Sequence, residues 1–203
     1  MTKIKLCGLT RPCDIAWANE LGPDYIGFVF ARKSKRYAAP ELAARLKALL
    51  NPEIQAVGVF VNEDVDTVAE LLRAGIIDVA QLHGKEDESY IAALRAKTDK
   101  PIFKAFRIDS EADVAKANAS SADFVLLDSG NGGTGTVFDW QLLQGIARPY
   151  FLAGGLHPGN IGEAVKALKP FGVDVSSGIE TDGLKDQAKM AQFVQAVRKE
   201  ETP

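Results

Sequence analysis

Two reactive side chains stand at the ends of apolar segments. Cys7 ends the run Ile4-Lys5-Leu6-Cys7, and Asp128 ends the run Phe124-Val125-Leu126-Leu127-Asp128. A thiolate can act as a general base or nucleophile, and burial raises the pKa of a carboxyl so that it can act as a general acid. Both residues also have ordinary explanations, because a lone cysteine is commonly a small buried apolar residue and an aspartate can cap a loop.

Two glycine-containing turns near the C-terminus have the composition of a phosphate site. The runs Phe151-Leu152-Ala153-Gly154-Gly155-Leu156 and Val173-Asp174-Val175-Ser176-Ser177-Gly178 are apolar, end in small residues and precede helical patterns. Glycine lets backbone N–H groups approach a ligand, and a helix that starts beyond adds unpaired N–H groups. Either turn alone could equally make a tight strand-to-helix connection. The succession of two turns favours phosphate binding.

Further polar side chains follow other apolar segments. Arg36 lies in a loop with four cations, where it is either a solvated residue or a fork for a substrate carboxylate. Gln81 and His83 are two residues apart in a strand, so their side chains point the same way. His83 is as readily a structural histidine as a catalytic one.

Three more charged residues belong to the same set of strands. Lys104 and Arg107 could fill the barrel interior or steer anions, and neither is specific. Asp174 is expected inside the barrel, near the phosphate turns and without a direct part in catalysis.

A repeating pattern of short apolar strands and amphipathic helices spaces these residues along the chain. Thr10 and Asn62 are expected to cap two of the helices. Strands are expected at Ile4–Cys7, Tyr25–Phe30, Ala56–Val61, Val79–His83, Ile102–Phe106 and Phe124–Asp128, with a seventh ending at Gly154-Gly155 and an eighth at Ser176. Eight strand-helix units of about 25 residues predict an α/β fold, a single-domain (β/α)8 TIM barrel over residues 1–203. A flavodoxin-like open sheet would need about five units.

The barrel fold predicts where the site lies. Active sites in such barrels sit where the strands end, so the reactive residues are expected to meet at one mouth. The glycine-rich stretch 129–136 after Asp128 is suited to a mobile loop beside that mouth. A short helix is expected from about Trp140 to Ile146.

Composition excludes several classes of function. Hydrophobic residues are 46% and charged residues 25% of the 203 residues, as in a soluble globular protein. The net charge of -3 does not favour nucleic acid or an anionic membrane. No apolar run approaches the length of a membrane span, and the start of the chain leads straight into a strand. Two cysteines and two histidines fit no metal pattern, and a reducing cytoplasm is the expected compartment.

Ordered motifs run through nearly the whole chain. The first half contains Lys5-Leu6-Cys7-Gly8-Leu9-Thr10, Gly27-Phe28-Val29-Phe30, the Ser34-to-Arg36 loop, Val57-Gly58-Val59-Phe60-Val61-Asn62 and Gln81-Leu82-His83-Gly84. The second half contains Leu127-Asp128-Ser129, Gly133-Thr134-Gly135, Phe138-Asp139-Trp140, Leu152-Ala153-Gly154-Gly155-Leu156 with Asn160, Val173-Asp174-Val175-Ser176-Ser177-Gly178-Ile179-Glu180 and Gly183-Leu184-Lys185-Asp186. Together these motifs resemble the phosphoribosylanthranilate isomerase family.

The resemblance implies an aldose-ketose isomerase of tryptophan biosynthesis. Such an enzyme converts N-(5-phosphoribosyl)anthranilate into 1-(2-carboxyphenylamino)-1-deoxyribulose 5-phosphate by an Amadori rearrangement. By analogy Asp128 is the general acid, Cys7 the general base and Arg36 the group that holds the anthranilate carboxylate. The turns Gly154-Gly155 and Ser177-Gly178 hold the phosphate.

The resemblance also assigns the remaining partners of the site. Gln81 and His83 join the substrate-binding residues. The protonated imine is itself the electron sink, so neither metal nor other cofactor is expected. The expected partner is a small phosphosugar, with no nucleic acid and no membrane. Monomer and homodimer both remain open.

Three alternatives remain beside the predicted isomerase. An indole-glycerol-phosphate synthase would be expected to carry a lysine and glutamates at its strand ends. A pentose-phosphate epimerase would want metal ligands, for which two histidines are poor material. A phosphate-binding barrel without catalysis differs from the isomerase only in activity.

Overall fold

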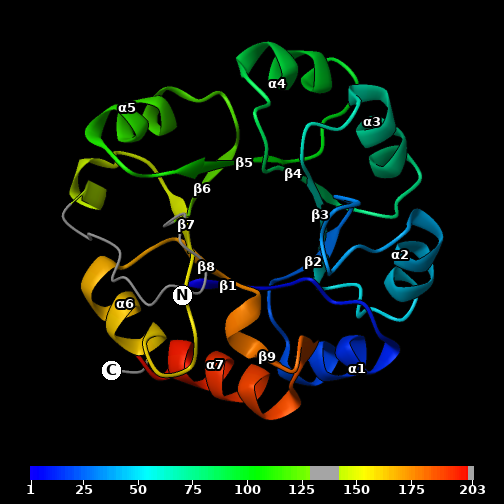
Figure 1. The fold of residues 1–203 in the computed structure, drawn as a ribbon, viewed down its shortest axis with the longest axis vertical. Helices are drawn as coiled ribbons and strands as arrows, with labels where there is room; N and C mark the ends of the chain where they lie inside the picture. Colours follow the sequence, from blue (N-terminus) through cyan, green and yellow to red (C-terminus); the bar gives the residue numbers. More distant parts are fainter. Residues whose placement is uncertain (129–141, 201–203) are drawn as a thin grey trace.

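Parallel strands close into a barrel that is surrounded by helices (Figure 1). The computed structural model describes residues 1–128 and 142–200, and over these residues eight strands pair in chain order, with the last returning to the first. The strands are β1 (Lys3–Cys7), β2 (Tyr25–Val29), β3 (Gln55–Phe60), β4 (Val79–Leu82), β5 (Ile102–Arg107), β6 (Phe124–Asp128), β7 (Tyr150–Ala153) and β8 (Gly172–Val175). The predicted α/β barrel is confirmed.

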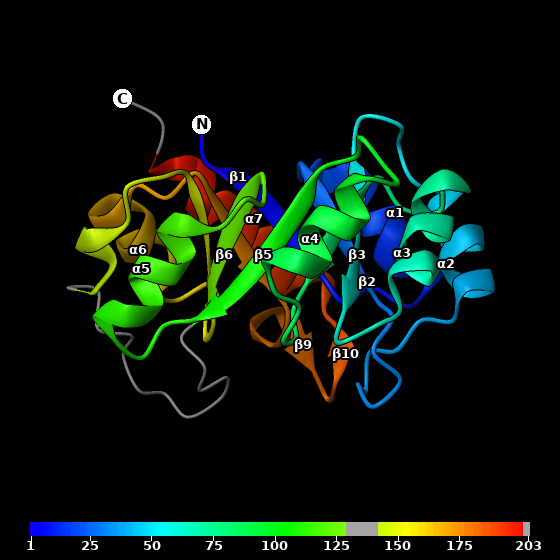
Figure 2. The ribbon, with the colours of Figure 1, turned by 90° about the horizontal axis from the view of Figure 1, so that it is seen from above.

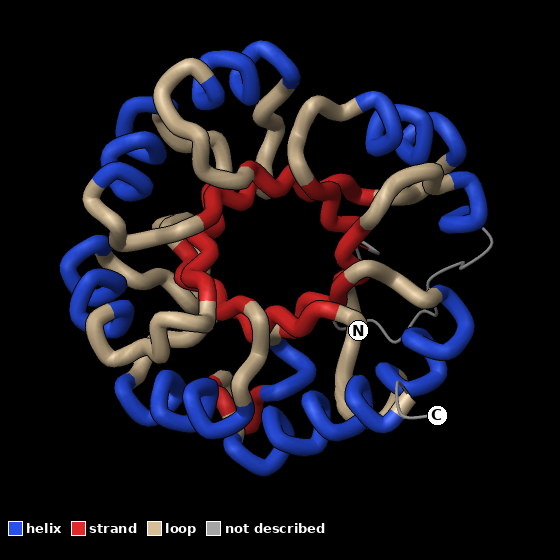
Figure 3. Tube along the Cα trace, turned by 180° about the vertical axis from the view of Figure 1, so that it is seen from behind, coloured by secondary structure: helices blue, strands red, loops and turns tan. Residues whose placement is uncertain are grey.

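The helices lie outside the ring of strands, as the tube in Figure 3 shows. They are α1 (Pro12–Leu21), α2 (Pro40–Lys47), α3 (Val65–Arg73), α4 (Glu88–Arg95), α5 (Glu111–Ala119), α6 (Ile161–Leu168) and α7 (Gln187–Lys199). In α7 the buried residues Met190, Phe193, Val194 and Val197 recur at helical spacing, so one face packs on the barrel. No described helix is long and apolar enough to cross a membrane.

Side chains inside the barrel form layers from one end to the other. At the amino ends of the strands, aromatic rings fill the interior, with centroids 4.9 Å apart for Phe103 and Phe151 and 4.7 Å apart for Phe124 and Phe171. At the carboxyl ends, Cys7 and the small apolar residues of β2 and β3 line the interior instead. The barrel is therefore filled at one end and hollow at the other.

The two predicted helix caps are wrong. The backbone N–H groups of Thr10 and Arg11 both donate to Oδ2 of Asp14 at 2.9 Å, so a carboxylate inside the first turn stabilises the start of α1. The N-cap of α3 is Asp64, which accepts from two N–H groups of the first turn. Asn62 has a positive φ of 53° and accepts a hydrogen bond from the loop after β4. In both helices, the carboxylate of a nearby aspartate accepts hydrogen bonds from backbone N–H groups at the helix start.

A short hairpin follows β8 that the sequence pattern did not predict. A 3-10 turn, η2 (Ser177–Ile179), leads into the antiparallel strands β9 (Glu180–Thr181) and β10 (Leu184–Lys185). Asp182 and Gly183 join these strands with φ of 52° and 77°, as a tight hairpin turn requires. Figure 2 shows the hairpin on the side of the barrel opposite the N-terminus.

The segment between β6 and β7 is described only in part. A 3-10 helix, η1 (Leu142–Gly145), occupies part of the short helix expected near Trp140 to Ile146. The predicted glycine-rich loop at 129–136 lies outside the described residues.

Candidate active site

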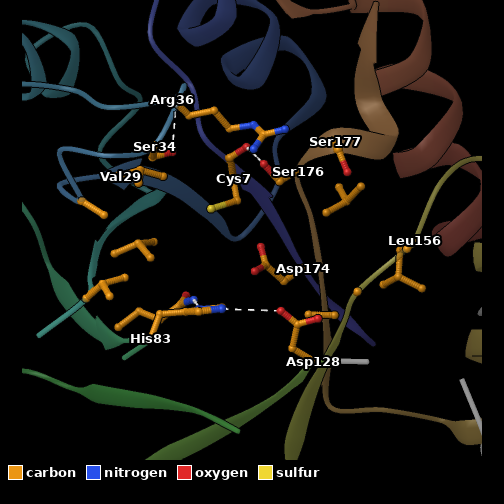
Figure 4. Close-up of a pocket in the computed structure, with 18 residues that line it drawn as sticks. Cys7, Val29, Ser34, Arg36, His83, Asp128, Leu156, Asp174, Ser176 and Ser177 are labelled. Atoms are coloured by element: carbon orange, nitrogen blue, oxygen red, sulfur yellow. Dashed lines mark hydrogen bonds and ion pairs between the residues drawn. The ribbon is translucent and has the colours of Figure 1, made fainter. Parts of the chain in front are cut away.

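A cavity of about 330 Å³ opens at the carboxyl ends of the strands (Figure 4). Its lining contains every predicted site residue except Gly178: Cys7, Arg36, Gln81, His83, Asp128, Gly154, Gly155 and Ser177. Apolar side chains such as Val29, Val59 and Leu156 form the remaining wall. The structure therefore brings together, in one pocket, residues that lie up to 170 positions apart.

The thiol of Cys7 points into this cavity (Figure 4), although only 6% of the residue is exposed. Gly27 stands opposite Cys7 in the register of β1 and β2, and a Cβ on Gly27 would lie 2.6 Å from the sulfur. Because Gly27 has no side chain, the Cys7 thiol has the space it occupies. Burial raises the pKa of the Cys7 thiol, against the attraction of Lys5, which lowers it.

An ion pair fills the barrel below the thiol. Lys5 is fully buried, and its Nζ donates to Oδ1 of Asp174 at 2.9 Å. Register places Lys5 beside Asp174 on the neighbouring strands β1 and β8. Asp174 also lines the cavity, so the expected position inside the barrel is observed.

Asp128 lies across the cavity from Cys7 and faces a histidine (Figure 4). His83 Nε2 is 3.5 Å from Oδ2 of Asp128, and Nε2 of Gln81 lies 2.9 Å from His83 Nδ1. With the Gln81 amide in this orientation it donates to Nδ1, which leaves the imidazole proton on Nε2 toward the carboxylate. The side chains of His83 and Asp128 are both about one-third exposed, at 34% and 29%.

Arg36 forms a fork with a glutamate from the hairpin. Its Nε and Nη2 donate to the two carboxylate oxygens of Glu180 at 2.6 and 2.8 Å. Lys185 donates to the same carboxylate at 2.6 Å and to the backbone oxygen of Ser176 at 2.9 Å. Two cations share one anion beside the cavity, so the cluster keeps a net positive charge suited to a carboxylate ligand.

The pKa values in this cluster follow from its contacts. Burial alone would raise the pKa of Glu180, but the hydrogen bonds from Arg36 and Lys185 outweigh it and lower the pKa below its usual value. Burial lowers the pKa of Lys185. The hydrogen bond to Glu180 raises the pKa of Arg36, which therefore stays charged.

The first glycine turn lines the cavity, and Ser177 of the second lines it as well. Gly154 and Gly155 have φ of 86° and 64°, a conformation that side chains disfavour. Asn160 supports this loop, because its Nδ2 donates to the backbone oxygen of Gly155 at 3.0 Å and its Oδ1 accepts from His157 N. Gly178 lies behind the lining, where a Cβ would come within 1.9 Å of the Leu156 oxygen.

Two of the considered cations lie away from the cavity. Lys104 Nζ donates to the backbone oxygen of Gly84 at 2.8 Å and lies near Glu86. Arg107 pairs with Asp109 at 2.6 Å on the exposed surface. Neither lines the cavity, so neither belongs to the site.

The comparison with protein families decides the classification of this barrel. The family model described as N-(5'phosphoribosyl)anthranilate (PRA) isomerase matches residues 4–196. The chain belongs to the phosphoribosylanthranilate isomerase family. The resemblance read from the sequence motifs is confirmed.

Individual relatives of the phosphoribosylanthranilate isomerase family agree over the whole length. The N-(5'-phosphoribosyl)anthranilate isomerase of Endomicrobium trichonymphae is 47% identical over 202 residues, which cover 98% of this chain and 99% of the relative. The crystal structure of TrpF from Jonesia denitrificans has a TM-score of 0.90 at 33% identity and 100% coverage of both chains. A phosphoribosyl anthranilate isomerase in complex with reduced 1-(o-carboxyphenylamino)-1-deoxyribulose 5-phosphate has a TM-score of 0.86 at 33% identity, covering 98% and 100%.

Sequence reasoning missed three charged residues around this isomerase-family site. Glu180 and Lys185 stand in the motifs quoted above, but they come from a hairpin without a periodic signal, so no pattern indicated that they lie near Arg36. Lys5 did carry a signal, because it is an ionisable residue in an apolar strand and two residues from Cys7. Such spacing puts both side chains on the same side of a strand.

Proposed function

We propose that this chain isomerises N-(5-phosphoribosyl)anthranilate to 1-(2-carboxyphenylamino)-1-deoxyribulose 5-phosphate by general acid-base catalysis. The observation that carries the proposal is the cavity shared by Cys7, Asp128, Arg36 and the glycine turn. Membership of the family and the named product analogue in a related structure support the choice of substrate.

The first step opens the sugar ring. The carboxyl of Asp128, in its protonated form, donates a proton to the furanose ring oxygen, the C1′–O bond breaks, and a protonated imine forms. The contact with His83 at 3.5 Å orients the carboxyl toward the cavity. General acid catalysis of this kind contributes about 10²–10⁴-fold in rate.

The second step moves a proton between carbon atoms. The thiolate of Cys7 removes the proton from C2′, and the electron pair flows into the imine to give an enolamine. Tautomerisation adds a proton at C1′ and removes the O2′ proton, which yields the ketone. Electrons move only within the substrate, with C1′ reduced and C2′ oxidised, so the balance requires no external oxidant or reductant.

The two anionic ends of the substrate are held on either side of the sugar. Arg36 binds the anthranilate carboxylate, and backbone N–H groups of the turns at Gly154-Gly155 and Ser177 bind the phosphate. Gln81 holds His83 in place. Fixing both ends between the acid and the base contributes several kcal/mol through orientation, on the order of the effect of an intramolecular reaction.

Loss of fluorescence of the aminoaldose on addition of the protein tests this proposal. The isomerase should remove the fluorescence of phosphoribosylanthranilate at a rate proportional to protein concentration, with the ketone identified by mass spectrometry. An unchanged signal would overturn the proposal. Release of carbon dioxide from the ketone would instead indicate the synthase alternative, and binding without turnover would indicate a non-catalytic barrel.

A further inference from the structure

Lys5 is a fully buried lysine inside the barrel, and the proposed mechanism does not use it. Its ammonium has no access to solvent, and transfer of an unpaired ion into such an environment is strongly unfavourable. The pair with Asp174 at 2.9 Å offsets part of this cost. An apolar residue would fill the same place without any ion, so packing alone gives no reason for the charge.

The position of Lys5 supplies that reason. Lys5 and Cys7 are separated by one residue on β1, so their side chains point to the same side and their Cα atoms lie about 6.6 Å apart along the strand. Asp174, the partner of Lys5, lines the floor of the cavity that contains the Cys7 thiol. The buried ion pair and the thiol therefore form one electrostatic unit.

Other charged groups also face the thiol. They are Lys5 on β1, Asp174 on β8, Lys185 on β10, Arg36 in the loop after β2, and His83 and Asp128 across the cavity. Glu180 pairs with both Arg36 and Lys185, which reduces their effect on the sulfur. Among the described residues, Lys5 forms an ion pair with one carboxylate, that of Asp174.

We propose that Lys5 is a positioning residue that stabilises the thiolate of Cys7, and that Asp174 opposes it. The ammonium is held below the sulfur by the hydrogen bond to Asp174 and serves both negative groups. This inference rests on the proposed role of Cys7 as general base. Lys5 acts through the thiol and not on the substrate itself.

The directions of the pKa shifts agree with this arrangement. Burial raises the pKa of Cys7, the attraction of Lys5 lowers it, the repulsion of Asp174 raises it, and Lys185 lowers it. Burial would lower the pKa of Lys5, but Asp174 and Cys7 outweigh burial and raise it. Lys5 therefore remains an ammonium at neutral pH.

Alkylation of Cys7 by iodoacetamide as a function of pH tests the proposal without turnover. In Lys5→Met the thiolate loses its cation, so alkylation at pH 7 should fall roughly tenfold or more and recover at higher pH. In Asp174→Asn the opposing anion is lost, so alkylation at pH 7 should increase. The two substitutions must change Cys7 alkylation at pH 7 in opposite directions. Changes in the same direction, or no change in the pH profile, would overturn the proposal.

Two controls keep the experiment decisive. Cys13, the other cysteine, serves as an internal reference and should keep its alkylation profile in every variant, as resolved by peptide mass spectrometry. Lys3→Met is the matched variant, because Lys3 lies on the same strand and pairs with Asp24 instead. It should leave the Cys7 profile and the turnover unchanged.

A double variant covers the case in which a single unpaired buried charge prevents folding. Lys5→Met combined with Asp174→Asn removes both charges and should reduce Cys7 alkylation at pH 7, though less than Lys5→Met alone. An alkylation profile equal to that of the native protein would contradict the proposal. Wild-type turnover of phosphoribosylanthranilate is measured separately, so failure of the proposed function would be recognised by itself.

Discussion

At the residue scale, the candidate acid and base have contrasting surroundings. Cys7 is almost completely buried, next to a glycine and above an ion pair. Asp128 keeps 29% of its side chain exposed and faces His83. Enzymes obtain an acid and a base at one pH by placing two groups in different environments. Burial of Cys7 raises the pKa of its thiol, so its role as base depends on nearby cations such as Lys5, which lower that pKa. Asp128 is less buried than expected for a general acid, so its role as acid is a point that kinetics must test.

Removal of either group should abolish most turnover. We expect Cys7→Ala and Asp128→Asn each to lower kcat by about 10²–10⁴-fold, because each deletes one proton transfer. Steady-state fluorescence kinetics measure the loss, and circular dichroism checks the fold. Cys13→Ala is the control, since Cys13 does not line the cavity. Near-normal kcat in either site variant would remove that residue from the mechanism.

At the element scale, the β9–β10 hairpin completes the rim of the barrel. It brings Glu180 and Lys185 next to Arg36, which comes from the loop after β2. Glu180 fixes Nε and Nη2 of Arg36, so the plane of the guanidinium is set before a ligand arrives. A carboxylate ligand then meets an oriented donor, which reduces the entropy lost on binding.

Loss of the guanidinium should affect binding more than chemistry. We expect Arg36→Met to raise KM roughly 10- to 150-fold with a smaller change in kcat, because a hydrogen bond to a charged group contributes about 1.5–3 kcal/mol. Arg32→Met is the matched control, since Arg32 is an exposed residue of the same loop. Initial rates over a range of substrate concentrations separate KM from kcat. An unchanged KM would exclude Arg36 from substrate binding.

At the scale of the whole molecule, local patterns were sufficient for the barrel. Each strand is a short apolar run and each helix has a buried stripe, so their order and number could be read without distant contacts. The common location of the strand ends then grouped Cys7, Arg36 and Asp128 in advance. The cap assignments at Thr10 and Asn62 failed because several polar residues stand near each helix start, and only geometry selects between them.

Ion pairs between residues that are far apart in the chain could not be predicted from the sequence. Lys5 and Asp174 are 169 residues apart, and Arg36 and Glu180 are 144 residues apart. Each pair depends on strand register or on a hairpin of two-residue strands that shows no alternation. Propensity and periodicity describe single segments, so they carry no information on such partners.

The Glu180 cluster also links the whole fold to pH, because it joins the β2 loop, the hairpin and β8. The lowered pKa of Glu180 means that its contribution to stability is complete above the unfolded-state pKa of about 4.3 and is lost as pH falls through the folded-state value. In Glu180→Gln this contribution is absent at every pH. The free energy of unfolding of the native protein should therefore exceed that of Glu180→Gln most at pH 6, with the difference shrinking toward pH 3.

Urea unfolding at a series of pH values measures this difference. Glu53→Gln, at an exposed position before β3, is the control and should show no such trend. A difference between native protein and Glu180→Gln that stays constant from pH 6 to pH 3 would mean that the carboxylate of Glu180 is not what ties the hairpin to the barrel. The hydrogen bonds from Arg36 and Lys185 would then serve the site alone and not the stability of the fold.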